Sequence, residues 1–210
     1  MCSDISNLAR CPWCGSDALS CAYHDDEWGV PEWDGRALWE KLILDGFQAG
    51  LAWITILRKR DSFRAAFADF DPAVIATWDE PEVTRLLADP GIIRHRGKIE
   101  ATIKNARAYL EIEAKTGFAP FLWDFVNGAP TQNRFSHGSQ IPAATPVSEA
   151  MSKALKRAGF GFCGPTITYA FMEATGLVND HLTTCHAHDK AAARANRQHD
   201  GGTSQRFCAK

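Results

Sequence analysis

Two cysteines and two histidines near opposite ends of the chain have the ligand chemistry of a metal site. Cys11 and His24 lie near the N-terminus, and His181 and Cys185 lie near the C-terminus with a His-x3-Cys spacing. Two thiolates and two imidazoles suit a tetrahedral zinc ion, and four protein ligands complete its coordination shell. A complete shell leaves no position for an activated water, so this ion would tie the chain ends together and catalysis would occur elsewhere.

Spacing alone leaves other ligand sets open. Cys11 and Cys14 form a Cys-x2-Cys pair, which occurs both in zinc ribbons and in redox pairs. Cys21, His186 and His188 are further candidate ligands. The same side chains could also be unrelated buried thiols and surface histidines, because the distance in sequence between the first cysteine and the first histidine is not diagnostic.

A second group of candidate residues combines one carboxylate with several aromatic rings. Asp45 follows an apolar run and precedes Trp53, and the N-terminal segment adds Trp13 and Tyr23. A negative charge near the end of a helix is unfavourable, which indicates a functional role for this acid. Aromatic faces with one acceptor suit a flat, electron-poor heterocycle, more so if it is cationic. The alternative is that the rings belong to the core and Asp45 is a local turn acceptor.

Residues 154–166 predict two helices joined by a glycine-rich hairpin. Gly159, Gly161 and Gly164 permit a tight turn and the close approach of another backbone. The second helix begins near Pro165, where free N–H groups can hold a phosphate oxygen. Nearby cations are Lys153, Lys156 and Arg157. An ordinary tight connection between two helices is the alternative explanation.

Helical signals dominate the elements that would position these residues. Caps and apolar spacing predict helices after Asp34, Asp61, Asp71 and Asp79, a long helix from Ile99 to Leu110, a short helix over 121–126, and a helix from Thr145-Pro146 to Leu155. A turn over 46–50 is expected to end the first of them. Residues 127–147 predict a loop, and no alternating run supports a strand. We therefore predict an all-α fold.

The composition predicts one folded domain with a polar tail. The chain has 210 residues, of which 45% are hydrophobic, and this is enough for one large core. We place the helical domain at 1–186, with the helix-hairpin-helix at about 152–176. Residues 187–210 are polar, include two adjacent glycines and are expected to be mobile.

Charge and cysteine usage limit the protein classes. Seven cysteines and no signal-peptide pattern favour a reducing, cytoplasmic location. The apolar stretch 42–57 is too short and too polar to span a membrane. A net charge of -2 does not indicate a nucleic-acid binder. Local basic clusters, such as Arg94, Arg96 and Lys98, are expected to be solvated helix faces.

Four longer motifs resemble those of one enzyme family. They read YHDDEWGVP over 23–31, QAGLAW over 48–53, GIIRHRGKI over 91–99 and GLVNDH over 176–181. From about Cys11 to Cys185 the chain resembles DNA-3-methyladenine glycosylase I, of the helix-hairpin-helix DNA glycosylases. The resemblance implies a monofunctional enzyme that removes N3-methyladenine from alkylated double-stranded DNA, leaves an abasic site and releases free 3-methyladenine. We expect a monomer that makes no membrane contact.

The resemblance also carries over individual residue roles. It implies one structural zinc ion bound by Cys11, His24, His181 and Cys185. Trp13, Tyr23 and Trp53 match the aromatic walls of the base pocket, and Asp45 matches its recognition acid, so Asp45 and Tyr23 are the expected catalytic residues. Gly50 and Leu51 match the turn that plugs the gap left by the extruded nucleotide. Gly159, Gly161 and Gly164 match the DNA-binding hairpin, to which Lys156 adds charge.

Two positions depart from the family pattern, and a third differs only from the wider superfamily. The recognition acid of the family is typically glutamate, and Asp45 is shorter by one carbon–carbon bond, roughly 1.5 Å. Cys14 is an additional thiol beside a zinc ligand. Many members of the wider superfamily have a catalytic aspartate where this chain has Asn179, followed by Asp180, and the resemblance implies that this subfamily does not depend on it.

The expected mechanism asks little of the protein. N3 alkylation places a positive charge on adenine, so the base leaves as a neutral molecule without prior protonation. The enzyme extrudes the base, binds it and lets water attack the sugar, without a lysine nucleophile. The alternatives are a zinc-stabilised DNA-binding or adaptor module without base release, and a zinc hydrolase, which the closed metal shell disfavours.

Overall fold

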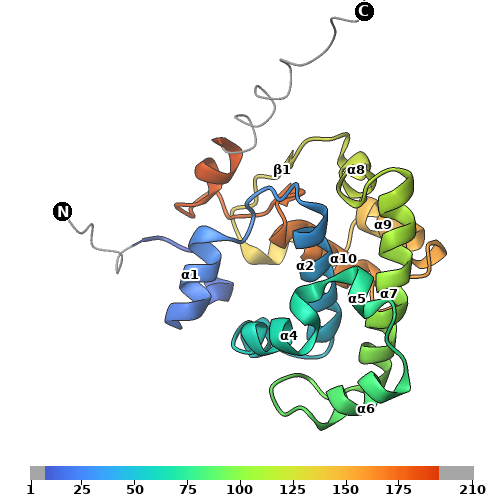
Figure 1. Ribbon diagram of the computed structural model, residues 1–210. Coiled ribbons are helices and arrows are strands. Elements are labelled where there is room, and N and C mark those ends of the chain that lie inside the picture. The colour runs from blue at the N-terminus through green and yellow to red at the C-terminus, as the bar shows by residue number, and fades with distance from the viewer. Residues whose placement is uncertain (1–7, 194–210) are drawn as a thin grey trace, which may run out of the picture.

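The computed structural model describes residues 8–193, which fold mostly into helices joined by loops (Figure 1). The predicted all-α class is confirmed. The helices are η2 (Pro12–Cys14), α1 (Ala18–Asp26), α2 (Gly35–Gln48), α3 (Trp53–Leu57), α4 (Arg60–Ala66), η3 (Ala68–Phe70), α5 (Pro72–Ile75), α6 (Glu80–Ala88), α7 (Arg96–Lys115), α8 (Phe118–Trp123), η4 (Asp124–Val126), η5 (Gly138–Gln140), α9 (Pro146–Arg157) and α10 (Pro165–Ala174). No helix in this part of the chain is both long enough and apolar enough to cross a membrane.

A short parallel ladder ties the long loop to the C-terminal segment. β1 (Thr131–Gln132) pairs with β2 (Val178–Asn179). Each strand has two residues, too few for an alternating pattern to be visible in the sequence. The ladder holds the loop 127–147 together with a further backbone hydrogen bond, which Thr183 donates to the carbonyl of Phe135 at 2.8 Å.

Many of the predicted helices begin at their caps, but several boundaries differ; the short helix predicted over 121–126, for example, begins at Phe118. Asp34 caps α2 by accepting from the amide of Ala37 at 2.8 Å. By contrast, α4 begins at Arg60, so Asp61 lies inside its first turn and is not the cap. α2 also continues through Gly46 to Gln48. A Cβ at Gly46 would lie 3.3 Å from the carbonyl oxygen of Phe162, so this glycine permits close packing against the hairpin and does not end the helix.

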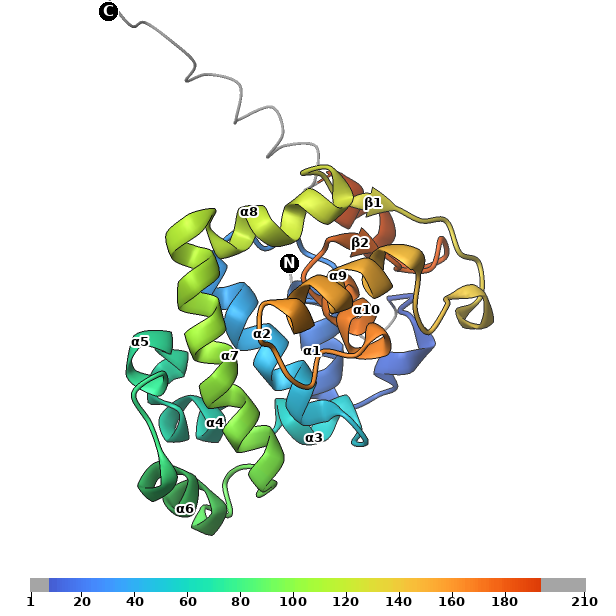
Figure 2. The same cartoon turned by 90° about the vertical axis from the view of Figure 1, so that its right-hand side faces the viewer.

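The core surrounds α2. This helix contacts α3, α7, α8 and α10, and Figure 2 shows it running alongside α7 and α10. Its Trp39 is fully buried and donates its indole N–H to the carbonyl of Phe70 at 3.0 Å. A second, smaller cluster joins the two ends of the chain, with Trp28 from the N-terminal part and Leu182 from the C-terminal part. α2 therefore carries its side chains into the interior from a well-fixed backbone.

The first residues of the predicted tail, from residue 187 onward, pack against the helical domain. Ala187, His188 and Ala191 are buried. The carbonyl of His188 accepts from the side-chain amide of Asn179 at 3.0 Å. The described part of the domain thus extends to residue 193, and the remainder of the predicted tail, 194–210, lies outside the described residues.

Candidate active site and metal centre

The aromatic and acidic candidates surround one cavity. Trp13, Tyr23, Asp45 and Trp53 all line a cavity of about 400 Å³. Its volume lies within the range of small-molecule sites. The other lining residues are Cys11, Pro12, Trp28, Lys41, Gln48, Gly138, Ile141, Ala170, Glu173, Ala174 and Leu182. The cavity is thus formed by both ends of the chain, by α2 and α10, and by the loop that contains η5.

The aromatic rings form a wall of the cavity whose exposure to solvent increases from Tyr23 to Trp13. Tyr23 is 4% exposed, and its ring centroid lies 5.2 Å from that of Trp53. Trp13 is 43% exposed, and its ring lies 5.0 Å from the ring of Trp28 and 6.3 Å from that of Tyr23. Burial, with a smaller contribution from Asp45, raises the pKa of Tyr23 well above its ordinary value. The phenol is therefore neutral at physiological pH, and Trp13 stands at the exposed edge of the wall.

Asp45 presents one free oxygen in this cavity. The residue is 1% exposed in the last turn of α2, and its Oδ1 accepts from the ammonium of Lys41. Its Oδ2 is buried and has no hydrogen-bond partner among residues 8–193, and neither has Nε1 of Trp53. Burial raises the pKa of Asp45 above its ordinary value, although Lys41 opposes this shift. A buried acceptor and a buried donor without partners are costly unless a ligand satisfies them.

Two charged residues of the cavity are not among the predicted site residues. Lys41 lies one helical turn before Asp45, a spacing that could have indicated the pair in the sequence, and its Nζ lies 4.0 Å from the ring centroid of Trp53. Glu173 comes from α10. Burial and the neighbouring Asp180 raise the pKa of Glu173 to about 8. Its place in the cavity depends on how α10 packs, which no local pattern shows.

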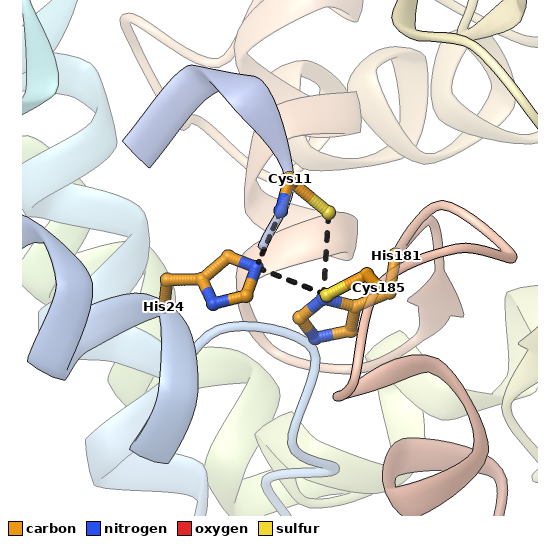
Figure 3. Close-up of side chains that lie close together, drawn as sticks. All are labelled: Cys11, His24, His181 and Cys185. Atoms are coloured by element: carbon orange, nitrogen blue, oxygen red, sulfur yellow. Dashed lines mark hydrogen bonds between the residues drawn. The ribbon is translucent and has the colours of Figure 1, made fainter. Parts of the chain in front are cut away.

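The four predicted metal ligands form one buried cluster (Figure 3). Sγ of Cys185 lies 3.5 Å from Nε2 of His24 and 3.6 Å from Nδ1 of His181, and Sγ of Cys11 lies 3.7 Å from the same Nδ1. In a tetrahedral zinc site with ordinary bond lengths, a sulfur and a nitrogen ligand are about 3.6 Å apart. The donor set and its spacing therefore fit such a metal.

Neighbouring groups orient all four ligands. Nδ1 of His24 is 2.8 Å from Asp25, and Nε2 of His181 is 3.0 Å from the carbonyl of Trp28. These bonds leave the opposite nitrogen of each ring for the cluster. Backbone N–H groups donate to both sulfurs, from Leu182 and Ala187, at 3.4 Å each. Such support from outside the ligand set is typical of a metal centre.

The thiols of the cluster have unequal affinities for protons. Hydrogen bonding to Cys185, followed by burial, raises the pKa of Cys11 above its ordinary value. The same hydrogen bond, together with those from the histidines, lowers the pKa of Cys185. The cluster therefore already stabilises one thiolate, the form in which cysteine binds metals.

The alternative ligands lie outside the four-residue cluster, but His186 is next to it and forms a second group of metal-binding residue types with His24 and Asp25. Cys14 and Cys21 are free thiols outside the four-residue cluster. Nε2 of His186 is 2.9 Å from Asp25, so it supports His24 through that carboxylate. Nε2 of His188 is 3.1 Å from the carbonyl of Asn133.

Hydrogen bonds to α7 hold the glycine-rich hairpin in place. Asn105 accepts from the amide of Gly161 at 2.7 Å and donates to its carbonyl at 3.2 Å. Gly159 has φ +105°, and a Cβ at Gly161 would lie 3.2 Å from that of Ala101. Gly164 caps α10, which begins at Pro165, and Lys156 is exposed in the last turn of α9. The hairpin thus presents backbone and positive charge to solvent.

The turn at Gly50 and Leu51 is anchored by a buried lysine. Gly50 has φ +83°, and Leu51 is 41% exposed. Lys98, from α7, is only 7% exposed and donates to the carbonyls of Phe47 at 2.8 Å and Ala49 at 2.7 Å. The expectation that Lys98 belongs to a solvated face is therefore wrong. The cation neutralises the carbonyl end of α2 and leaves the apolar tip of the turn exposed.

Asn179 and Asp180, which follow α10, both make hydrogen bonds inside the protein. Asn179 is buried and donates to Gln132 at 2.8 Å. Asp180 is also buried and accepts from the hydroxyl of Tyr169 at 2.6 Å and the side-chain amide of Asn133 at 2.7 Å. The side chain of Asp180 is thus held by hydrogen bonds inside the protein, and it is not among the residues that line the cavity.

Comparisons with known proteins give a consistent result. The family model for methyladenine glycosylase matches residues 13–188. DNA-3-methyladenine glycosylase 1 of Escherichia coli is 53% identical over 179 residues, which cover 85% of this chain and 96% of that protein. DNA-3-methyladenine glycosylase of Haemophilus influenzae is 50% identical over 178 residues, covering 84% and 96%.

Solved structures agree in fold. A crystal structure of 3-methyladenine DNA glycosylase I has a TM-score of 0.85 and 54% identity, and it covers 86% of this chain and all of that one. A structure of the Staphylococcus aureus enzyme, described as the basis of its 3-methyladenine recognition, has a TM-score of 0.83 and 38% identity, covering 86% and 97%.

Proposed function

The chain belongs to the methyladenine glycosylase family, and from this premise we propose that it extrudes N3-methyladenine from alkylated double-stranded DNA and hydrolyses its N-glycosyl bond. The observation that carries the proposal is the cavity with aromatic walls, in which Asp45 has one buried oxygen without a partner. The products are free 3-methyladenine and an abasic site.

The cavity supports a specific arrangement for the base. Trp53 stacks against the flat ring, and Tyr23 and Trp13 form walls of the cavity, with Trp13 at its exposed edge. Oδ2 of Asp45 accepts from the exocyclic amine of the base, which satisfies the carboxylate oxygen. Although aspartate is shorter than glutamate, Asp45 still lines the cavity.

The chemistry needs orientation more than acid or base catalysis. N3-methyladenine leaves as a neutral molecule, so no residue must protonate it. Tyr23 serves as a neutral wall, because its pKa lies well above the physiological range. Lys41 is bound to Asp45, which supports hydrolysis by water over attack by an amine. Borohydride treatment during turnover tests this point, and a trapped covalent adduct with DNA would contradict a monofunctional mechanism.

Two surface elements support DNA binding. The hairpin around Gly159, Gly161 and Gly164, together with Lys156, is proposed to bind backbone phosphates without reading sequence. The turn at Gly50 and Leu51 is proposed to fill the space vacated by the base, since its tip is apolar and exposed. Both contact the duplex from a fixed support on α7.

We also propose that the buried cluster binds one structural zinc ion. Cys11, His24, His181 and Cys185 would supply the four ligands, with spacings that suit a tetrahedral ion. When bound, the ion would hold the N-terminal and C-terminal segments together. Because Cys11 and Leu182 also line the cavity, this closure shapes the base site.

The decisive experiment is to incubate the protein with methylated DNA and to identify the released bases by chromatography. Release of 3-methyladenine is expected. Binding of methylated duplex without any base release would instead indicate a DNA-binding or adaptor module.

Substitutions in the cavity test the base arrangement. Asp45→Asn replaces a charged acceptor, which contributes about 1.5–3 kcal/mol, so affinity for free 3-methyladenine should fall about tenfold to a hundredfold. Trp53→Ala should weaken it similarly, since stacking on an aromatic ring contributes about 1–3 kcal/mol. Quenching of tryptophan fluorescence reports both.

Matched controls separate the site from stability. Asp61→Asn removes a carboxylate that is 97% exposed, and Trp33→Ala removes a tryptophan outside the cavity. Zinc content and thermal melting check folding, because Asp45→Asn also leaves the buried Lys41 without its carboxylate. If both cavity variants bind the base as wild type does, this cavity is not the base site. The monomeric state and cytoplasmic location remain predictions, to be tested by light scattering and cell fractionation.

A further inference from the structure

Lys41 makes the same two kinds of contact that are proposed for the base. Its ammonium donates to Oδ1 of Asp45, and it lies 4.0 Å from the ring centroid of Trp53. A cation over an indole face is attracted by the ring. The cavity therefore contains a positive charge of its own beside the acid that receives the base.

The pair formed by Lys41 and Asp45 carries no net charge. Burial lowers the pKa of Lys41 and raises that of Asp45, so their affinities for a proton move toward each other. Whether the proton stays on the amine or moves to the carboxyl, the total charge of the pair is zero. Of the neighbouring acids, Glu173 has a pKa of about 8, and Glu27 is bound to Arg60 at 2.5 Å.

A neutral cavity has a particular consequence for this reaction. In DNA, N3-methyladenine is cationic, and as the N-glycosyl bond breaks its positive charge moves to the sugar. A lone carboxylate would stabilise the cationic base, which is the ground state, and so would oppose the loss of charge. Only interactions that are stronger in the transition state than in the ground state accelerate a reaction.

We propose that Lys41 is a specificity-determining residue that cancels the charge of Asp45, so that the cavity is complementary to the departing neutral base and not to the cationic base in DNA. This inference rests on the proposed function, because it requires the cavity to be the base site. The bound Oδ1 also leaves Oδ2 as the oxygen available to the base.

The test compares two ligands of nearly the same shape. Free 3-methyladenine is neutral, whereas 3,9-dimethyladeninium is a fixed cation that imitates the base attached to sugar. Wild type should bind the neutral ligand more tightly. Lys41→Met should shift the ratio of the two affinities toward the cation by about tenfold or more and slow single-turnover excision by a similar factor. Lys41→Arg keeps the charge and should keep the wild-type ratio.

A second comparison tests the role of Lys41 without the single variant Lys41→Met, in case that variant does not fold. Because the buried Lys41 has a lower pKa still when its carboxylate is removed, the charged reference is the double variant Asp45→Asn with Lys41→Arg, in which the guanidinium stays protonated. This reference should bind the cation least well, whereas the double variant Asp45→Asn with Lys41→Met is neutral and should bind the cation about tenfold more tightly than the reference. Identical affinity ratios in wild type and Lys41→Met, or equal affinities of the two double variants for the cation, would overturn the role of Lys41. Failure of wild type to bind either ligand or to release 3-methyladenine would instead overturn the proposed function.

Discussion

Replacing Lys98 by methionine separates DNA engagement from base binding. The Lys98 ammonium is buried and donates to two carbonyls at the end of α2, just before the exposed turn of Gly50 and Leu51. Methionine has a similar length and fits an apolar environment, but it cannot donate. The last carbonyls of α2 would then lack their partner, and the turn would lose its anchor.

The size of the effect follows from the two bonds. A hydrogen bond from a charged donor contributes about 1.5–3 kcal/mol, so the pair contributes about 3–6 kcal/mol before desolvation is considered. Burial opposes the charged form, as the lowered pKa of Lys98 indicates, and methionine avoids that penalty. We therefore expect the free energy of unfolding to fall by about 2–3 kcal/mol, near the upper part of the usual range for single substitutions.

Urea denaturation and single-turnover excision measure the two consequences. Excision from methylated DNA should fall about tenfold or more, while the affinity for free 3-methyladenine should change by less than about threefold, since Lys98 is not among the residues that line the cavity. Lys104→Met is the matched control, because Lys104 is exposed on the same helix. Wild-type excision by Lys98→Met, or an equal loss in the control, would refute the anchoring role of Lys98.

Three further predictions concern the metal, pH and the hairpin. Cys185→Ser should lower the zinc content, measured by elemental analysis, below one ion per chain. Because the site closes a very long loop, the variant should also reduce the free energy of unfolding by on the order of 3–5 kcal/mol, measured by thermal melting. Unchanged zinc content would rule out Cys185 as a ligand. Glu173 has a folded pKa of about 8, above its unfolded value, so its stabilising contribution is complete below about pH 4.5 and is lost as pH rises through 8, by up to about 1.4 kcal/mol per pH unit. Glu173→Gln should flatten that decline in urea titrations, and an unchanged pH profile would contradict the assignment. Gly161→Glu should weaken binding to methylated and unmodified duplexes alike by about tenfold at low salt, measured by fluorescence anisotropy; selective loss for methylated DNA would argue against a phosphate contact.

The sequence was most informative where the signal is local or chemically distinctive. Asp34 and Asp71 cap the helices they were expected to cap, because an aspartate followed by helix-forming residues needs only nearby amides. The four metal-binding candidates lie in one cluster, since thiols and imidazoles have few other reasons to gather. The all-α class followed from the sum of many such signals.

Long-range packing was out of reach of the same reasoning. Lysine is usually a surface residue, and Lys98 is buried because it donates hydrogen bonds to the carbonyls at the end of α2. Glu173 reaches the cavity through the packing of α10, and Ile141 reaches it from a loop without periodicity. Lys41 is the exception, because its spacing from Asp45 was visible in the sequence.

The supports on α7 impose a strict length on that helix. Lys98 and Asn105 are seven residues apart, nearly two turns, and they hold the turn at Gly50 and Leu51 and the glycine-rich hairpin respectively. Adding one residue between them would rotate one support by about 100° relative to the other, whereas adding seven would restore the face but lengthen the span by about 10 Å. A substitution on the exposed side of α7 leaves this spacing unchanged, whereas an insertion or deletion between Lys98 and Asn105 changes the distance and the orientation between the turn at Gly50 and Leu51 and the glycine-rich hairpin.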